Sequence, residues 1–137
     1  MYAGLDTSVP VAGLRSKRGA SFQILRAIRA GDIRIAVSVA LVLEYESVVL
    51  RPGLIPHFTA DELRRIVDGL CQLADHQQVF FAWRPFLADA DDDLVLELAV
   101  AASAAFIITH NINHFRGSDS MGVRAITPAT TLGFIRP

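Results

Sequence analysis

The stretch YAGLDTS, residues 2–8, begins as a short apolar run and ends on Asp6, Thr7 and Ser8. An apolar run of this length that stops at polar residues is typical of a buried strand. We therefore expect a first strand that carries Asp6 at its carboxyl end. Because ligands of open parallel sheets bind at the carboxyl ends of the strands, Asp6 is the first candidate site residue.

Strand-like and helix-like patterns alternate along the rest of the chain. Apolar runs predict further strands at residues 33–37, 79–83, 106–109 and 123–126. Helical spacing predicts helices at about residues 21–30, 38–51, 59–74, 89–105 and 127–134. Ser8, Pro10 and Gly13 interrupt the pattern after the first strand, so no element is expected there. Such alternation predicts an α/β fold: a three-layer sandwich with a central, mostly parallel sheet between helices, formed as one domain over residues 1–137.

Several residues mark the expected helix ends. Ser21 and Ser38 stand where an N-cap is expected, and Gly31 stands where the first of these helices should stop. Thr59 with Glu62 has the spacing of a capping box, which predicts the start of the helix that runs to about Ala74.

Composition bounds the classes of function. The 137 residues carry 13 basic and 14 acidic side chains, for a net charge of −1. A broad basic surface is therefore excluded, and any nucleic-acid contact must come from local patches. The basic residues of the first 34 positions form either a solvated surface or a phosphate-contacting face. They are Arg15, Lys17, Arg18, Arg26, Arg29 and Arg34.

Other sequence features concern disulfides, membrane association and nucleotide-binding motifs. The single cysteine, Cys71, excludes an intramolecular disulfide and is expected to be a buried, unreactive thiol. No signal peptide and no apolar run long enough for a membrane span is recognised, so a soluble cytoplasmic protein is expected. Neither of the two common glycine-rich phosphate-binding motifs occurs.

Acidic and amide side chains collect at the expected strand ends. Beside Asp6, these are Glu44 in the helix after the second strand, the run DADDD at 89–93, and Asn111 and Asn113 after the strand 106–109. Glu44 is flanked by apolar residues and is expected to face the protein interior. A carboxylate there needs either an ion pair, for which Arg51 is available, or a bound cation.

Four acids in five positions exceed what capping one helix requires. Asp92 shares a helix side with Val95 and Ala99, so it is the favoured site residue, whereas Asp89 or Asp93 would cap the helix or support the site. The pattern leaves open which of Asp89, Asp91, Asp92 and Asp93 would be a ligand.

A site of carboxylates favours hard cations. Oxygen ligands suit Mg²⁺ or Mn²⁺ better than Zn²⁺, and such ions polarise a phosphodiester and activate water. His110 and His114 are spaced by four residues but fall in an expected loop, not in a helix, which makes a zinc site the weaker alternative.

Five short motifs follow one another in a recognisable order. They are Asp6-Thr7-Ser8, Ser38 through Glu44-Tyr45, VVLRP at 48–52, DADDD at 89–93 before an alanine-rich helix, and Thr109 through His114-Phe115; AITP at 125–128 and Phe134 follow them. Together they resemble the PIN domain family over nearly the whole chain. They are most similar to its branch of toxin–antitoxin toxins, which resemble the virulence-associated protein C-type ribonucleases.

The resemblance implies a function. It implies an Mg²⁺- or Mn²⁺-dependent endoribonuclease that cleaves single-stranded RNA and serves as the toxin of a type II toxin–antitoxin pair. By position, Asp6, Glu44 and Asp92 would be catalytic metal ligands, oriented by the hydroxyl groups of Thr7, Ser8 or Thr109. Asn111 stands where many members have a fourth acid, and Ser8 stands where asparagine is usual. The missing acid should weaken the binding of a second ion.

Two alternatives and two protein partners complete the expectations. The missing fourth acid also suits a catalytically weak PIN-like module that acts through a protein partner. A small-molecule phosphohydrolase is a third possibility, although Ser8 replaces the second Asp of one common phosphatase motif. The resemblance implies an antitoxin that inserts an arginine among the acids. A homodimer is also expected, and the apolar stripe of helix 59–74 would supply either its interface or the core.

Overall fold

The computed structural model describes residues 1–79 and 86–135. Its strands are β1 (Tyr2–Leu5), β2 (Arg34–Val37), β3 (Asp75–His76), β4 (Phe106–Ile108) and β5 (Arg124–Ile126). Its α-helices are α1 (Ser8–Arg15), α2 (Ala20–Ala30), α3 (Val39–Val49), α4 (Ala60–Leu73), α5 (Ala90–Ala101) and α6 (Pro128–Ile135). Two 3-10 helices, η1 (Ile112–Phe115) and η2 (Ser118–Met121), lie between β4 and β5.

The five strands form one parallel sheet in the order β3-β2-β1-β4-β5. The first strand, β1, is central, and its residues Ala3 to Leu5 pair with Phe106 to Ile108 of β4. The backbone of Asp6 extends this pairing, since its N–H donates to the carbonyl of Ile108 over 3.0 Å. The predicted α/β class is confirmed, and Asp6 lies at the carboxyl edge of the sheet.

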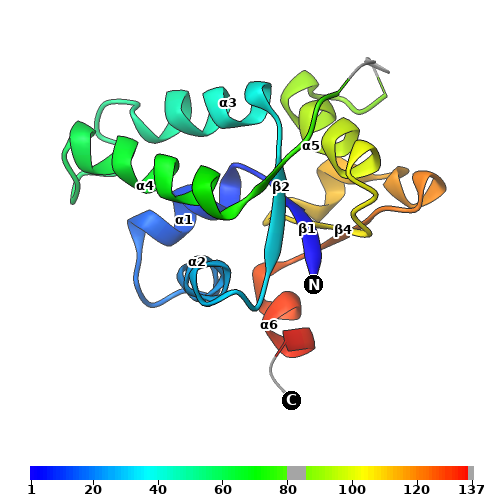
Figure 1. Ribbon diagram of the computed structural model, residues 1–137, viewed down its shortest axis with the longest axis horizontal. Coiled ribbons are helices and arrows are strands. Elements are labelled where there is room, and N and C mark those ends of the chain that lie inside the picture. Colours follow the sequence, from blue (N-terminus) through cyan, green and yellow to red (C-terminus); the bar gives the residue numbers. More distant parts are fainter. Residues whose placement is uncertain (80–85, 136–137) are drawn as a thin grey trace.

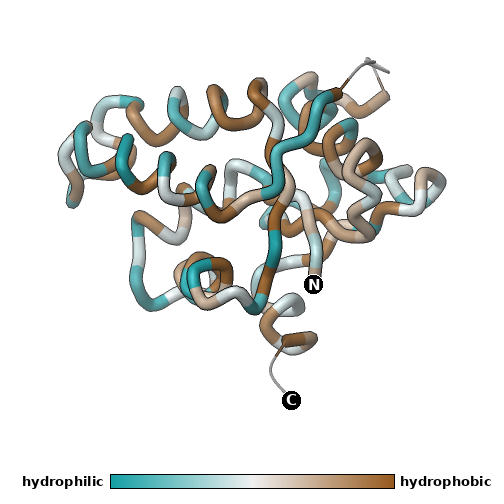
Figure 2. The backbone as a smooth tube through the Cα atoms, in the orientation of Figure 1, coloured by the Kyte–Doolittle hydropathy of each residue, from teal (hydrophilic) through white to brown (hydrophobic). Residues whose placement is uncertain are grey.

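Helices cover both sides of the sheet. Figure 1 shows α1 and α2 on one side of the strands and α5 on the other. The core between these layers is aliphatic and includes the fully buried Leu5, Ile35, Val95 and Ile107. Helix α4 shows how one element joins this core, since Figure 2 shows apolar and polar residues alternating along its turns. The sandwich therefore follows from buried strand runs and one-sided helices.

Three helix ends lie where short sequence motifs predicted them. The Ser38 hydroxyl accepts from the N–H of Leu41 at 3.2 Å, which caps α3 as predicted. Thr59 and Glu62 form the predicted capping box at α4, with bonds of 3.1 and 2.9 Å. Gly31 ends α2 with a left-handed φ of 86°, a conformation that glycine adopts without steric cost.

Two predictions at the start of the chain are wrong. Residues 8–15 form helix α1, because Pro10 lies in the first turn, where a missing N–H costs no hydrogen bond. Ser21 is not an N-cap, since α2 begins one residue earlier behind Gly19. Gly13 belongs in α1 because α2 lies against it: a β-carbon there would meet Leu25 Cδ1 at 2.7 Å.

We expect Gly13→Ala to destabilise the protein. The added methyl group would also lie 3.1 Å from the carbonyl oxygen of Ser21, so α1 and α2 would have to move apart, at a cost of about 1–3 kcal/mol. Gly69→Ala in α4 is the matched control, because nothing lies within 4 Å of the added atom and alanine favours helix. Urea denaturation should show a loss for the first variant and none for the second; equal stability of both would contradict the close packing of α1 on α2.

Two further expectations concern β3 and α4. Of the predicted strand 79–83, residues 80–83 lie outside the described residues, and the strand beside β2 is β3 at Asp75–His76. In α4, Leu63, Val67 and Leu70 are buried in this chain's own core, which accounts for most of the apolar stripe. Leu73, at the end of the stripe, is 49% exposed.

Among the described residues, no helix has the length and apolar character needed to cross a bilayer.

Candidate functional site

The candidate site lies at the carboxyl edge of the sheet, where β1 and β4 end beside the starts of α1, α3 and α5. Asp6 and Thr7 link β1 to α1, Thr109 follows β4, Glu44 lies in α3 and Asp92 in α5. The fold brings these residues together from positions more than 100 residues apart, as the bond between Thr109 and Asp6 shows.

Asp6 is held by two hydroxyl groups. Ser8 Oγ donates to Asp6 Oδ2 at 2.6 Å, and Thr109 Oγ1 donates to the same oxygen at 2.7 Å. Within the described residues, Asp6 Oδ1 has no hydrogen-bond partner. The carboxylate, which is 7% exposed, is thus fixed through one oxygen and leaves the other for a ligand.

Glu44 is held in a similar way by one hydroxyl group, from the residue before α1. Thr7 Oγ1 donates to Glu44 Oε2, while Tyr45, next in the chain, donates from its buried hydroxyl to the carbonyl of Leu5. Partial burial raises the pKa of Glu44, and the negative charges of Asp91 and Asp6 raise it further against the bond from Thr7. Arg51 is exposed, and no ion pair joins it to Glu44 in the described part of the chain, so the arginine explanation of Glu44 fails.

The Asp92 carboxyl group has a strongly raised pKa. Burial raises its pKa to about 6, and the charge of Asp6 adds to the rise. His114 opposes the rise, with Nδ1 3.5 Å from Asp92 Oδ2. The influence of Asp6 on Asp92 and on Glu44 indicates that Asp6 lies within electrostatic reach of each of the other two predicted acids.

The other acids of α5 have separate roles. Asp89 caps the helix, since its Oδ1 accepts from the N–H of Asp91 at 2.8 Å. Asp93 is buried and accepts from the N–H of Leu87 at 2.9 Å, so it fixes the segment before the helix. Asp91, which the sequence left as one of four open candidates, interacts with Glu44 and raises its pKa. Helix periodicity alone did not reveal this neighbour, because it belongs to a different helix.

The two histidines are separated. The ring nitrogen Nε2 of His110 hydrogen-bonds to the hydroxyl of Ser21. The backbone N–H of His110 donates to Ser8 Oγ at 3.3 Å. His114 lies in η1 and contacts Asp92 instead. The pair therefore does not form the zinc site considered as an alternative, and His114 is a site residue that the sequence did not single out in this role.

Asn111 is exposed beside this cluster. Its backbone N–H donates to Thr109 Oγ1 at 2.9 Å, so Thr109 is bonded both to Asp6 and to the following loop. The Asn111 side chain makes no hydrogen bond with the described residues.

The donor set fits a divalent cation. The available atoms are carboxylate oxygens, which suit Mg²⁺ or Mn²⁺. Burial and nearby acids, Asp6 among them, raise the pKa of Glu44 and that of Asp92, and His114 opposes the rise at Asp92. Within residues 1–79 and 86–135, no three acidic, His or Cys side chains are already grouped closely enough to share an ion. Because like charges repel, we expect the free oxygens to converge only when a cation neutralises them.

A parallel α/β domain with hydroxyl-supported carboxylates at the carboxyl edge of its sheet belongs to a class suited to metal-dependent phosphodiester chemistry. A family model described as the PIN domain matches residues 3–113, which is most of the chain, and the chain therefore belongs to the PIN domain family. PIN domains are in general nucleases that use divalent metal ions. A search of curated proteins finds no match to the chain.

We expect Asp92→Asn to stabilise the metal-free protein near neutral pH. A raised pKa means that the folded state binds more protons than the unfolded state between pH 3.8 and about 6. The free energy of unfolding of the parent therefore falls as the pH rises through this window. The asparagine variant should lack this fall and gain on the order of 1–2 kcal/mol.

Urea denaturation across this pH range measures the effect, and Asp32→Asn, at an exposed acid beyond α2, is the control. If the free energy of unfolding of the parent and that of Asp92→Asn change with pH in parallel, the pKa of Asp92 is not raised by burial and by Asp6.

Proposed function

We propose that this protein is an endoribonuclease that cleaves single-stranded RNA with Mg²⁺ or Mn²⁺ as its cofactor. The observation that carries the proposal is the support of two carboxylates by neighbouring hydroxyl groups. Ser8 and Thr109 bond one oxygen of Asp6, and Thr7 bonds one oxygen of Glu44. Asp92 completes the set from α5.

The chain's own groups have distinct tasks in this proposal. Asp6, Glu44 and Asp92 would hold the cation through their free oxygens, while the hydroxyl groups keep Asp6 and Glu44 oriented. The cation supplies polarisation of the phosphodiester and a lower pKa for the attacking water. His114 adds an N–H donor at the edge of the site, within reach of an anionic substrate.

The biological role follows from the motif resemblance. We assign the protein as the toxin of a type II toxin–antitoxin pair, with an antitoxin that places an arginine against Asp6, Glu44 and Asp92. Two exposed apolar residues of α3, Val39 and Leu43, lie one helical turn apart close to Glu44 and suit contact with such a partner. Sedimentation of the protein alone would test the accompanying homodimer.

The test is cleavage of three substrates by purified protein: single-stranded RNA, duplex RNA and single-stranded DNA. Each is incubated with Mn²⁺, with Mg²⁺ and with EDTA. The proposal expects cutting of single-stranded RNA with a metal and no cutting in EDTA. Cutting that persists in EDTA, or none with either metal, would contradict it.

Asn111 favours one alternative function. A neutral side chain beside the acids provides one negative charge fewer for a second ion, which suits a catalytically weak module acting through a protein partner. RNA binding without cleavage under every metal condition would favour this alternative, whereas turnover with Mn²⁺ would exclude it.

A further inference from the structure

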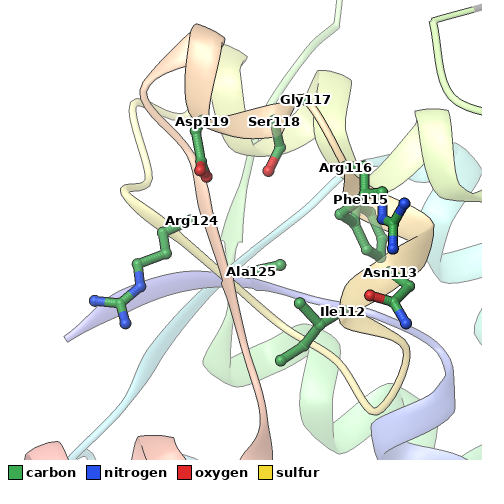
Figure 3. Close-up of a pocket in the computed structure, with 9 residues that line it drawn as sticks. All are labelled: Ile112, Asn113, Phe115, Arg116, Gly117, Ser118, Asp119, Arg124 and Ala125. Atoms are coloured by element: carbon green, nitrogen blue, oxygen red, sulfur yellow. The ribbon is translucent and has the colours of Figure 1, made fainter.

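A pocket of about 300 Å³ is lined in part by η1, the 3-10 helix that also carries His114 of the candidate site. Figure 3 shows its lining, which comes from η1, from residues 116 and 117, from the start of η2, and from β5. Asn113 and Arg116 are drawn near one another at one side, Ser118 and Asp119 along another wall, and Arg124 extends from the opposite side. The pocket thus combines cationic, amide and carboxylate groups.

Helix η1 connects this pocket to the acids. His114 of η1 contacts Asp92, while its chain neighbours Asn113 and Phe115 line the pocket. A polymer bound with one phosphate at the acids would therefore pass over η1 and reach the pocket with a neighbouring unit.

The pocket has cationic side chains that are not engaged elsewhere. Within the described residues, the guanidinium groups of Arg116 and Arg124 form no hydrogen bond or ion pair. Arginine binds phosphate through two parallel N–H donors, and Arg116 shares its side of the pocket with the Asn113 amide. This side suits a phosphate group.

The remaining lining suits a nucleobase. Ile112 is 43% exposed and offers an apolar surface, and Asp119 offers a carboxylate that accepts from ring N–H or amino groups. The carboxylate would repel a second phosphate, so the charges favour one orientation: phosphate at Arg116 and base towards Asp119.

We propose that this pocket binds one nucleotide of the RNA next to the bond that is cleaved, with Arg116 and Asn113 on its phosphate. The inference rests on the proposed ribonuclease function and adds a subsite to it. Seven of the nine lining residues follow residue 113, where the family match ends, so the subsite is a feature of this chain beyond the matched segment.

The test measures RNA binding apart from cleavage. A fluorescent single-stranded RNA of mixed sequence is titrated in EDTA with the parent, with Arg116→Ala and with Asn113→Ala. The Arg116→Ala variant loses one phosphate contact, so it should bind the RNA about tenfold more weakly than the parent. The slope of the logarithm of its binding constant against the logarithm of the salt concentration should be smaller by about 0.7. Arg116→Lys keeps the charge without the paired donors and should bind with intermediate affinity.

Arg65→Ala is the matched control, because Arg65 is an exposed arginine of α4 without an ion pair among the described residues and lies outside the basic group of the first 34 positions. It should bind RNA like the parent, and thermal melting checks that each variant is folded. Equal weakening by Arg65→Ala, or parent-like binding by Arg116→Ala and Asn113→Ala, would overturn the subsite.

The two proposals fail differently. A parent that cleaves RNA, with pocket variants that bind normally, removes the subsite and leaves the ribonuclease. A parent that binds RNA through Arg116 but never cleaves it removes the ribonuclease and leaves the pocket. A parent that neither binds nor cleaves RNA overturns both.

Discussion

Asp6→Asn lowers metal-dependent RNA cleavage at least about 100-fold while the protein stays folded, if Asp6 holds the catalytic cation. Asparagine has nearly the same shape, and its side-chain oxygen can still accept from Ser8 and Thr109. The change therefore removes the negative charge and keeps the local packing. The rate of cleavage of single-stranded RNA under single-turnover conditions measures the effect, and far-ultraviolet circular dichroism checks the fold.

The control for Asp6 is an acid elsewhere on the surface. Asp32→Asn alters the net charge of the chain by the same amount at an exposed position outside the site, and it should cleave at the parent rate. If both variants lose activity to the same degree, net charge is responsible. If neither does, Asp6 is not a ligand of the catalytic ion.

Glu44→Gln should lower cleavage to a similar extent and also weaken Mn²⁺ binding. Glu44 is half-buried, and Asp91 and Asp6 raise its pKa, so its charge is costly without a cation. Glutamine still accepts the bond from Thr7 through its side-chain oxygen, but it does not neutralise a divalent ion. Calorimetric titration with Mn²⁺ and the cleavage rate should therefore change together.

Helix α3 offers a close control for Glu44. Glu46 lies two residues further on and faces Arg64, with 3.8 Å between Glu46 Oε1 and Arg64 Nε. Such an exposed pair contributes little to stability, so Glu46→Gln should bind Mn²⁺ and cleave RNA as the parent does. Equal losses of Mn²⁺ binding and of the cleavage rate in both variants would show that α3 tolerates no change of charge. That result would contradict a specific role for Glu44.

The sequence predicted elements whose signals are local. The buried run before Asp6, the cap at Ser38 and the capping box at Thr59 depend on neighbouring residues, and the structure has each of them. Parallel pairing then follows from the alternation of strands and helices, and it places the carboxyl ends of the strands at one edge of the sheet. The pairing of β1 with β4, which brings Asp6 to Thr109, is a strand order that the sequence did not predict.

Other features depend on packing between distant segments. Pro10 and Gly13 were interpreted as helix breakers, but Pro10 lies in the first turn of α1 and Gly13 lies where α2 crosses closely. The contact of Asp91 with Glu44, and that of His114 with Asp92, join residues of different elements. Periodicity within one helix carries no information about such pairs.

The most direct test of the account is a titration of metal-stripped protein with Mn²⁺ while cleavage of single-stranded RNA is followed. We expect no cleavage before the metal is added, a rate that rises and saturates with Mn²⁺, and a return to zero when EDTA is added. Cleavage by the stripped protein at the full rate, or no cleavage at saturating Mn²⁺ by folded protein, would contradict the claim that Asp6, Glu44 and Asp92 hold a catalytic cation.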